Sequence, residues 1–266
     1  MSLPKDWPVA LGHIAQYIAN LSLLGRSPST VAVHMSAISR EHKILGMSDP
    51  TNHFLIQKLM YGLRRSVKRC DTRAPITVEI LQQLPKALDA ICFSNYEAEL
   101  FKAAFSLAFF GFLRVGEMVF TTMANMDRPL KVDDVSVHSE FMEVTIRLSK
   151  TDQNGHGITL RLPQIQQVGI CPVQAMRRYL RVRSKRGVYL FQHFDGKWVT
   201  RSQFTKVLTK ALRFLHLNTA QFKAHSFRIG AATAAAIQGV SKDNIQGWGR
   251  WSSNAYQRYI RIAWVM

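Results

Sequence analysis

The carboxyl-terminal part of this sequence gathers the side chains needed to hold and attack a phosphodiester. They are an imidazole, a guanidinium, an indole and a phenol, contributed by His225, Arg228, Trp251 and Tyr259. Guanidinium and indole N–H groups donate hydrogen bonds to phosphate oxygens, an imidazole moves protons, and a phenol can act as a nucleophile. A histidine and an arginine three residues apart are also common on solvated helix faces, so this pair alone leaves both interpretations open.

A further arginine lies where the sequence is otherwise apolar. Arg114 follows the run 105–113, in which a serine and a glycine are the exceptions to apolar side chains. A guanidinium in such surroundings must be paired or must face a cleft, because burying an unpaired charge is costly. Glu117, about one helical turn further on, could form an internal ion pair with Arg114, and this structural interpretation competes with phosphate binding.

Together with one lysine, these residues resemble the active site of the tyrosine recombinases, also called phage-type integrases. The family's six residues occur in its order along the chain, as Arg114, Lys150, His225, Arg228, Trp251 and Tyr259. The motifs that carry the resemblance are Leu113-Arg114-Val115-Gly116-Glu117, Leu148-Ser149-Lys150-Thr151-Asp152, His225-Ser226-Phe227-Arg228, Gly249-Arg250-Trp251 and Tyr259-Ile260-Arg261. Six positions in the right order are far more specific than any two, and the resemblance covers nearly the whole chain.

The resemblance implies phosphoryl transfer without a metal or any other cofactor. Attack on a phosphodiester adds a second negative charge at the phosphorus, and Arg114 and Arg228 would clamp the non-bridging oxygens. Tyr259 would expel a DNA 5′-hydroxyl and leave a 3′-phosphotyrosyl link. Because this link conserves the energy of the phosphodiester bond, the 5′-hydroxyl of another strand can reverse the step.

Four other residues would assist this chemistry. Lys150, expected on a β-hairpin, would protonate the leaving oxygen, although an exposed turn lysine that touches DNA is the alternative. His225 would accept the phenolic proton or donate to the phosphate. The indole N–H of Trp251 would reach a non-bridging oxygen, and Glu117 would orient Arg114 or the neighbouring backbone.

The nucleophile has a rival in Tyr256, three residues earlier and on a similar helical face. Tyr259 is favoured because of its distance from Trp251 and because Ile-Arg follows it. The step from Trp251 to Tyr259 is eight residues, one fewer than in most bacterial and phage members. The sequence over 249–261 resembles that of recombinases of eukaryotic DIRS and crypton mobile elements. Tyr256 and Trp248 are then expected to be packing residues of the core.

The composition is typical of a compact protein that binds a polyanion. The 266 residues carry 35 Lys and Arg against 17 Asp and Glu, a net charge of +18, and 47% of them are hydrophobic. Such a charge attracts phosphate, whereas the hydrophobic content excludes a purely basic tail. No apolar run approaches the roughly 18 residues of a membrane-spanning helix. The three cysteines show no paired spacing and no metal-ligand cluster, so neither a disulfide framework nor a metal site is expected.

Periodic apolar residues predict a small helical domain over residues 1–70. Three amphipathic helices are expected, at about 6–24, 28–45 and 51–69. This region resembles the core-binding domain of the same family, although a generic helical bundle would have the same periodicity. The predicted DNA contacts are basic residues of the second and third helices: Arg40, Lys43, Arg64, Arg65, Lys68 and Arg69. The run 64–69 is also compatible with a nuclear import signal.

A linker is predicted at 70–76, where a proline interrupts the periodicity, and an α+β catalytic domain is predicted over 77–266. The fold class is therefore mainly α with a small β-hairpin. The expected elements are a helix over 77–88, an apolar helix bearing Arg114, strands over 140–148 and 158–162, and helices over 172–185, 200–215 and 225–237. A turn at 154–155 would join the strands and place Lys150 at the start of a loop. Asp133 and Asp134 are expected on a solvated face.

The favoured function is that of a site-specific DNA recombinase or integrase. Double-stranded DNA is the expected partner, and the resemblance implies a homotetramer on paired sites without membrane association. The alternatives are a catalytically silent DNA-binding relic and an enzyme like the type IB topoisomerases. The complete set of six residues argues against a relic, and His225, where the topoisomerases have lysine, argues against the second. A protein from a eukaryotic mobile element would be expected in the nucleus, and otherwise in the cytoplasm or nucleoid.

Overall fold

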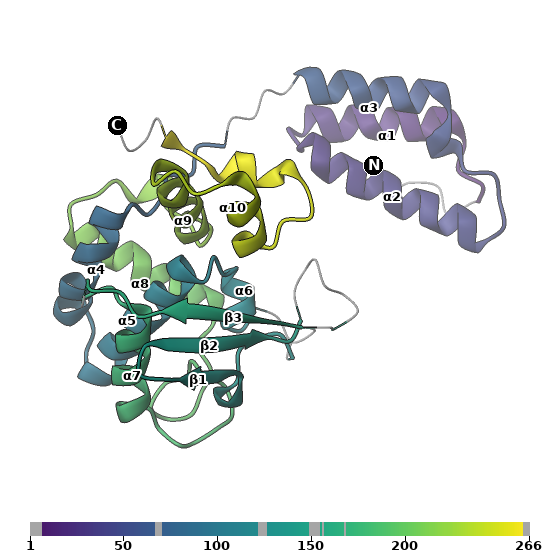
Figure 1. Ribbon diagram of the computed structural model, residues 1–266. Coiled ribbons are helices and arrows are strands. Elements are labelled where there is room, and N and C mark those ends of the chain that lie inside the picture. Colours follow the sequence, from purple (N-terminus) through teal and green to yellow (C-terminus); the bar gives the residue numbers. More distant parts are fainter. Residues whose placement is uncertain are drawn as a thin grey trace. The chain divides into compact units, whose positions relative to one another are not determined.

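The computed structural model describes residues 7–66, 71–121, 127–148, 155, 157–167 and 169–262. The chain forms two compact units, Met1–Asp71 and Thr72–Met266, and each has its own hydrophobic core. The predicted fold class is confirmed, since helices predominate and the described strands form a small antiparallel sheet (Figure 1). Within these described ranges, no helix combines the length and the apolarity needed to cross a bilayer. The predicted site residues Lys68, Arg69 and Lys150 lie outside the described residues.

The amino-terminal unit contains the three predicted helices. They are α1 (Leu11–Leu23), α2 (Pro28–Ile44) and α3 (Phe54–Ser66), and the short 3-10 turn η1 (Pro50–Asn52) precedes α3. Helix α2 begins where its sequence predicts, because the Ser27 hydroxyl accepts the Thr30 N–H at 3.0 Å and Pro28 suits the first turn. Helix α1 begins later than predicted. The backbone before it is extended, and the Val9 N–H donates to Nε2 of the fully buried His42 at 3.2 Å.

Part of the segment predicted as a linker belongs to the core of the carboxyl-terminal unit. Ala74 and Ile76 are buried, and their N–H groups donate to the carbonyls of Gln221 and Ser226, each at 2.9 Å. The predicted boundary is therefore too late. Pro75 breaks the helical periodicity, but the extended segment 74–76 packs against the start of a helix far along the chain.

Helices and one sheet form the body of this unit. The helices are α4 (Val78–Ile91), α5 (Asn95–Phe110), α7 (Pro172–Val182) and α8 (Arg201–Phe214), and the strands are β1 (Val135–Val137), β2 (Phe141–Ile146) and β3 (Ile158–Pro163). The strands lie side by side in this order, all antiparallel (Figure 1). In β2, Met142, Val144 and Ile146 are buried and alternate with half-buried residues, as expected for a sheet with one covered face. Helix α5 is buried on most of its surface because it packs against α4, α7 and the later helix α9 (Ser226–Ile237).

The turn before the sheet corrects one expectation. Asp134 is buried and not on a solvated face. Its carboxylate accepts the Lys131 N–H at 2.7 Å and pairs with the Arg147 guanidinium at 3.0 Å. Arg147, which follows β2, also donates to the Pro129 carbonyl at 3.3 Å. Burial of the acid is compatible with folding because both of these donors satisfy it, and the pair holds the strand end that precedes Lys150.

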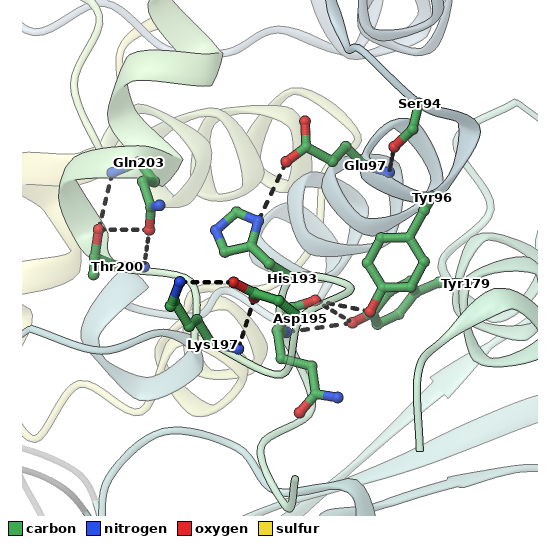
Figure 2. A network of polar contacts seen from close by, with 10 residues as sticks. Ser94, Tyr96, Glu97, Tyr179, His193, Asp195, Lys197, Thr200 and Gln203 are labelled. Atoms are coloured by element: carbon green, nitrogen blue, oxygen red, sulfur yellow. Dashed lines mark hydrogen bonds and ion pairs between the residues drawn. The ribbon is translucent and has the colours of Figure 1, made fainter. Parts of the chain in front are cut away.

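A polar network fastens the segment between α7 and α8 to the helices (Figure 2). The phenol of Tyr96 donates to the Gln192 carbonyl, and the phenol of Tyr179 donates to the Leu190 carbonyl, each at 2.9 Å. Figure 2 also shows the His193 ring directed at the Glu97 carboxylate, 3.2 Å away. Because Tyr96 and Glu97 belong to α5 and Tyr179 belongs to α7, side chains of two helices position the segment that leads into α8.

The last part of the chain contributes α9 (Ser226–Ile237), α10 (Lys242–Gly249) and the 3-10 turn η5 (Asn254–Tyr259). Helix α9 packs against α5, and both α10 and η5 pack against α9. Gly230 allows the segment 74–76 to cross α9, because a Cβ at this glycine would lie 1.8 Å from the carbonyl oxygen of Ile76.

We expect Gly230→Ala to lower the free energy of unfolding by about 3 kcal/mol, because the added methyl forces two buried backbones apart. Urea unfolding of the whole chain measures this change. Gly247→Ala is a matched control, since its Cβ would meet nothing within 4 Å on helix α10. The control should gain stability by up to about 1 kcal/mol from helix propensity and chain entropy. Equal stabilities of the two variants would show that the segment 74–76 moves aside at no cost.

Candidate active site

Helix α5 ends before it reaches the arginine that was expected on it. The helix stops at Phe110, Gly111 is its C-cap, and Phe112 adopts a left-handed φ of 49°. Arg114 therefore lies at the N-cap of the short helix α6 (Val115–Met118) and keeps 18% of its side chain exposed. The expectation of an arginine inside a buried helix is wrong, because a turn within a continuous apolar run gives no periodic signal.

Glu117 gathers three N–H groups around its buried carboxylate. Oε1 accepts from the Arg114 guanidinium at 2.9 Å, and Oε2 accepts from the Arg114 backbone N–H, also at 2.9 Å. Oε2 additionally pairs with the Arg250 guanidinium at 2.8 Å. The internal ion pair between Arg114 and Glu117 is thus confirmed. It is compatible with phosphate binding, because Arg250 shares the same carboxylate.

Arg228 is fully buried and joins two parts of the chain. Its guanidinium donates to the carbonyl oxygens of Phe112 and Gly249. The same group lies over the Trp251 ring, with 4.2 Å between Cζ and the ring centre. Within the described part of the chain, its Nε has no hydrogen-bond partner.

The charges around Arg228 are mostly positive. Burial, and then the neighbouring charges of Arg114 and Arg250, lower the pKa of Arg228. The carboxylate of Glu117, which contacts Arg114 and Arg250, faces these three guanidiniums, and two positive charges therefore remain uncompensated. Such a cluster favours an anion that carries about two negative charges and accepts several N–H donors.

His225 is the N-cap residue of α9. Burial, followed by the positive charges of Arg73 and Arg201, lowers its pKa to about 4. The imidazole is therefore neutral at pH 7 and can accept a proton. Its Nδ1 atom is buried and has no partner among the described residues.

This neutral histidine predicts how stability changes with pH. The imidazole takes up a proton near pH 6.5 in the unfolded chain but only near pH 4 in the folded chain. Between these values the unfolded state binds more protons, so the free energy of unfolding decreases as the pH falls. We expect His225→Gln to remove this component, so that its stability falls less between about pH 7 and about pH 5 than that of the wild type. Urea unfolding at both pH values measures the difference, and parallel pH profiles would contradict a neutral His225.

Trp251 packs against both candidate tyrosines. Its ring centre lies 5.0 Å from that of Tyr259 and 6.3 Å from that of Tyr256. Both tyrosines face it because residues three apart eclipse in a 3-10 turn. Tyr256 is buried, whereas Tyr259 is half-buried and its ring centre lies 5.6 Å from Cζ of Arg228. A Cβ at Gly249 would lie 1.6 Å from the indole, so this glycine makes room for Trp251.

The two aromatic residues predicted to be packing residues differ in solvent exposure. Tyr256 is 3% exposed, as predicted, whereas the prediction for Trp248 is wrong because this side chain is 48% exposed. Helix α10 is short and buries only Ile245 and Gly249. Trp248 lies on its outer side, with its ring 6.1 Å from that of Phe112.

Thr233 fixes the tyrosine segment to α9 and is absent from the sequence-based predictions. Its buried hydroxyl donates to the Tyr259 carbonyl at 3.2 Å and accepts the Arg261 N–H at 3.0 Å. A single threonine in the alanine run 231–236 is the signal that could have identified it. The helix that carries Arg228 thus also holds the backbone of Tyr259.

The structure brings five of the six predicted site residues together, and Lys150 lies outside the described residues. The five are Arg114, His225, Arg228, Trp251 and Tyr259. They come from the turn after α5, the start of α9 and the segment after α10. The backbone turns at 111–112 and 249–250 meet through the guanidinium of Arg228.

In the amino-terminal unit, three predicted DNA contacts line one groove. Arg40 and Lys43 of α2 and Arg64 of α3 border this groove of about 630 Å³. Arg65 is not among its lining residues, and its guanidinium lies over the Tyr61 ring, 5.6 Å from the ring centre. The groove therefore places three positive charges between residues of α2 and α3.

Comparison with known proteins gives matches along nearly the whole chain. The sequence profile described as "Phage integrase family" matches residues 77–263. A protein of Selenomonas ruminantium, described as an integrase/recombinase xerD homolog, is 26% identical over 266 residues, covering 96% of this chain and 74% of its own length.

Solved structures share the fold. The Tn1549 transposon integrase in complex with transposon right end DNA superposes with a TM-score of 0.65 at 14% identity, covering 99% of this chain and 85% of that chain. A lambda integrase dimer bound to a COC′ core site gives 0.63 at 15% identity, with 96% and 65% covered. XerH bound to a difH substrate gives 0.55 at 14% identity, with 88% and 67% covered.

Proposed function

Since this chain belongs to the phage integrase family and is a DNA recombinase of the tyrosine type, we propose that Tyr259 is its nucleophile. The phenolic oxygen attacks the phosphorus of one DNA strand, the bond to the 5′ oxygen breaks, and a 3′-phosphotyrosyl link remains. A 5′-hydroxyl then attacks this link, releases Tyr259 and restores a phosphodiester.

The guanidinium cluster stabilises the transition state in this proposal. Arg114 and Arg228 donate to the non-bridging oxygens, on which the second negative charge develops. The two uncompensated positive charges around Glu117 match that charge. Because these donors are fixed before the substrate binds, little reorganisation is needed during the reaction.

Two proton transfers complete the balance of the cleavage step. His225, neutral at pH 7, accepts the phenolic proton. Lys150 supplies a proton to the leaving 5′ oxygen, and the resemblance of its motif to the family supports this role. The indole N–H of Trp251 adds a donor to the phosphate.

A single observation carries the assignment: the fully buried Arg228 has an unused Nε donor within the described residues and lies 5.6 Å from the ring of the half-buried Tyr259. A buried cation without a full set of partners, beside an accessible phenol, supports attack on a bound phosphate.

The test is to trap the covalent intermediate and locate it. The protein is incubated with nicked duplexes from the DNA that flanks its own gene, so that the cleaved strand diffuses away and the adduct accumulates. Trypsin cleaves after Arg258 and so separates Tyr256, in peptide 251–258, from Tyr259, in peptide 259–261. The nucleotide is expected on the peptide that contains Tyr259. An adduct on peptide 251–258, or no adduct on any of these duplexes, would overturn the proposal.

Double-stranded DNA is the proposed partner, and a homotetramer on paired sites is the proposed assembly. The Tn1549 integrase, lambda integrase and XerH structures are complexes with DNA. The net charge of +18 supports the same partner. In this proposal the groove lined by Arg40, Lys43 and Arg64 contacts the phosphate backbone.

Replacing Arg40, Lys43 and Arg64 together by alanine is expected to weaken DNA binding and to reduce its salt dependence. The slope of log K against log salt is negative, and each phosphate that the protein no longer neutralises makes it shallower by about 0.9. The magnitude of the slope should therefore fall by about 2 to 3 in the triple variant. Fluorescence anisotropy at several salt concentrations measures it. Lys58→Ala is the control, because Lys58 lies on the same helix as Arg64 but does not line the groove. A triple variant with the wild-type slope would exclude the groove as the DNA-binding surface.

A further inference from the structure

Arg250 occupies a backbone conformation that favours glycine. It ends α10 with φ 54° and ψ 46°, and Trp251 follows directly. Helices commonly end with glycine at such a left-handed position, because a side chain there is strained. An arginine in this place indicates that its side chain has a role that outweighs the strain.

The Arg250 side chain reaches the turn that precedes Arg114. It is 7% exposed, and its guanidinium donates to the Gly111 and Phe112 carbonyls at 3.3 and 3.4 Å. Its closest contact is the Glu117 carboxylate at 2.8 Å. The Phe112 carbonyl thereby accepts hydrogen bonds from both Arg250 and Arg228, so two guanidiniums bind the same turn.

The contact with Glu117 decides how much positive charge Arg114 can offer to a ligand. A lone pair of Arg114 and Glu117 would be neutral, because the carboxylate would compensate the guanidinium fully. With Arg250 on Oε2, the same carboxylate is shared by two cations. Arg114 is then partly uncompensated and keeps an exposed edge.

We propose that Arg250 is a positioning residue that engages Glu117, so that the charge of Arg114 remains available for the scissile phosphate. This inference rests on the proposed function of Arg114 as a phosphate clamp. It adds Arg250 to the site as a residue that touches neither the phosphate nor the nucleophile. The same side chain ties the turn before Trp251 to the turn before Arg114.

A double-mutant cycle between Arg250 and Glu117 tests the charge relation. Arg250→Gln keeps donors for the carbonyls but removes the charge, and it is expected to slow adduct formation by about 100-fold. In the Glu117→Gln background, where no carboxylate needs a partner, the same change should slow it by less than about tenfold. Equal effects in both backgrounds would overturn the proposal, because they would mean that Arg250 only fastens the turns.

A second readout does not depend on cleavage. Inorganic phosphate should raise the melting temperature of the wild type through the guanidinium cluster. The rise should shrink in Arg250→Gln and recover in the double variant with Glu117→Gln. Phosphate stabilisation with this pattern, but no adduct from the wild type, would contradict the proposed function and leave the inference standing. Cleavage at the wild-type rate and unchanged phosphate stabilisation in Arg250→Gln would contradict the inference about Arg250 and leave the proposed function standing.

The chain offers a matched control for the strained backbone. His216 also follows a helix with a left-handed φ of 57°, but its side chain is exposed. Arg250→Gly and His216→Gly both relieve strain, and only Arg250→Gly is expected to slow adduct formation, again by about 100-fold. Equal rates for the two glycine variants would contradict a role of the Arg250 side chain. If Arg250→Gln fails to fold, Arg250→Gly takes its place in the cycle.

Discussion

Tyr259→Phe is expected to abolish the covalent protein–DNA adduct while leaving DNA affinity within about twofold of the wild type. Phenylalanine keeps the ring that packs 5.0 Å from Trp251 but has no oxygen to attack phosphorus. Tyr259 is half-buried, and its ring centre lies 5.6 Å from Cζ of Arg228. Denaturing gels of a reaction with a nicked duplex measure the adduct, and anisotropy measures binding.

Tyr256→Phe is the matched control for this experiment. Its ring also faces Trp251, at 6.3 Å, but the residue is 3% exposed. Because Tyr256→Phe keeps this packed ring and leaves the phenol of Tyr259 in place, it should form the adduct at a rate within about threefold of the wild type. Adduct formation by Tyr259→Phe, or its absence in Tyr256→Phe alone, would reverse the assignment.

Arg228→Lys is expected to lower the rate of adduct formation by about 1,000-fold or more. Lysine keeps the positive charge but concentrates it on one nitrogen, so it lacks the planar fork whose two terminal nitrogens donate to the carbonyls of Phe112 and Gly249 in Arg228. The variant also has no counterpart of the Arg228 Nε, which has no hydrogen-bond partner within the described residues. Single-turnover kinetics on the nicked duplex measures the rate.

Arg213→Lys is a suitable comparison, because Arg213 is exposed in the last turn of α8. It should leave the rate unchanged, and circular dichroism should show both variants folded. A rate for Arg228→Lys within about tenfold of the wild type would mean that charge alone is sufficient at this position. The clamp would then have to be reassigned.

The helices of the amino-terminal unit are predictable because their signals are local. Val31, Met35 and Ile38 recur at helical spacing, and Ser27 with Pro28 marks the start of α2. The strand β1 cannot be predicted in this way, because three residues are too few to show alternation. The burial of Ile76 is equally hidden, since it depends on Gly230, a partner far away in the sequence.

For the site, motif order predicts residues that the structure brings together, but it does not predict how they are held. The motif identifies Arg114 but not its place after a turn, because that turn depends on the left-handed Phe112. Arg250 lies inside one of the family motifs and gives no signal of its own, since a charged residue beside a glycine is ordinarily solvated. Its burial follows from a carboxylate more than 100 residues earlier in the chain, Glu117.

Helix α9 bears on which subunit's tyrosine would attack a given DNA strand in the proposed assembly. Its start carries His225 and Arg228, and two turns later the Thr233 hydroxyl holds the backbone of Tyr259. In the proposed function, one helix therefore carries the groups that bind the phosphate and also holds the backbone of the nucleophile. A tyrosine held in this way would, in the proposed function, attack the strand bound by its own subunit. Subunits assembled on paired sites would then cooperate by aligning DNA ends, and no subunit's tyrosine would attack the strand bound by another subunit.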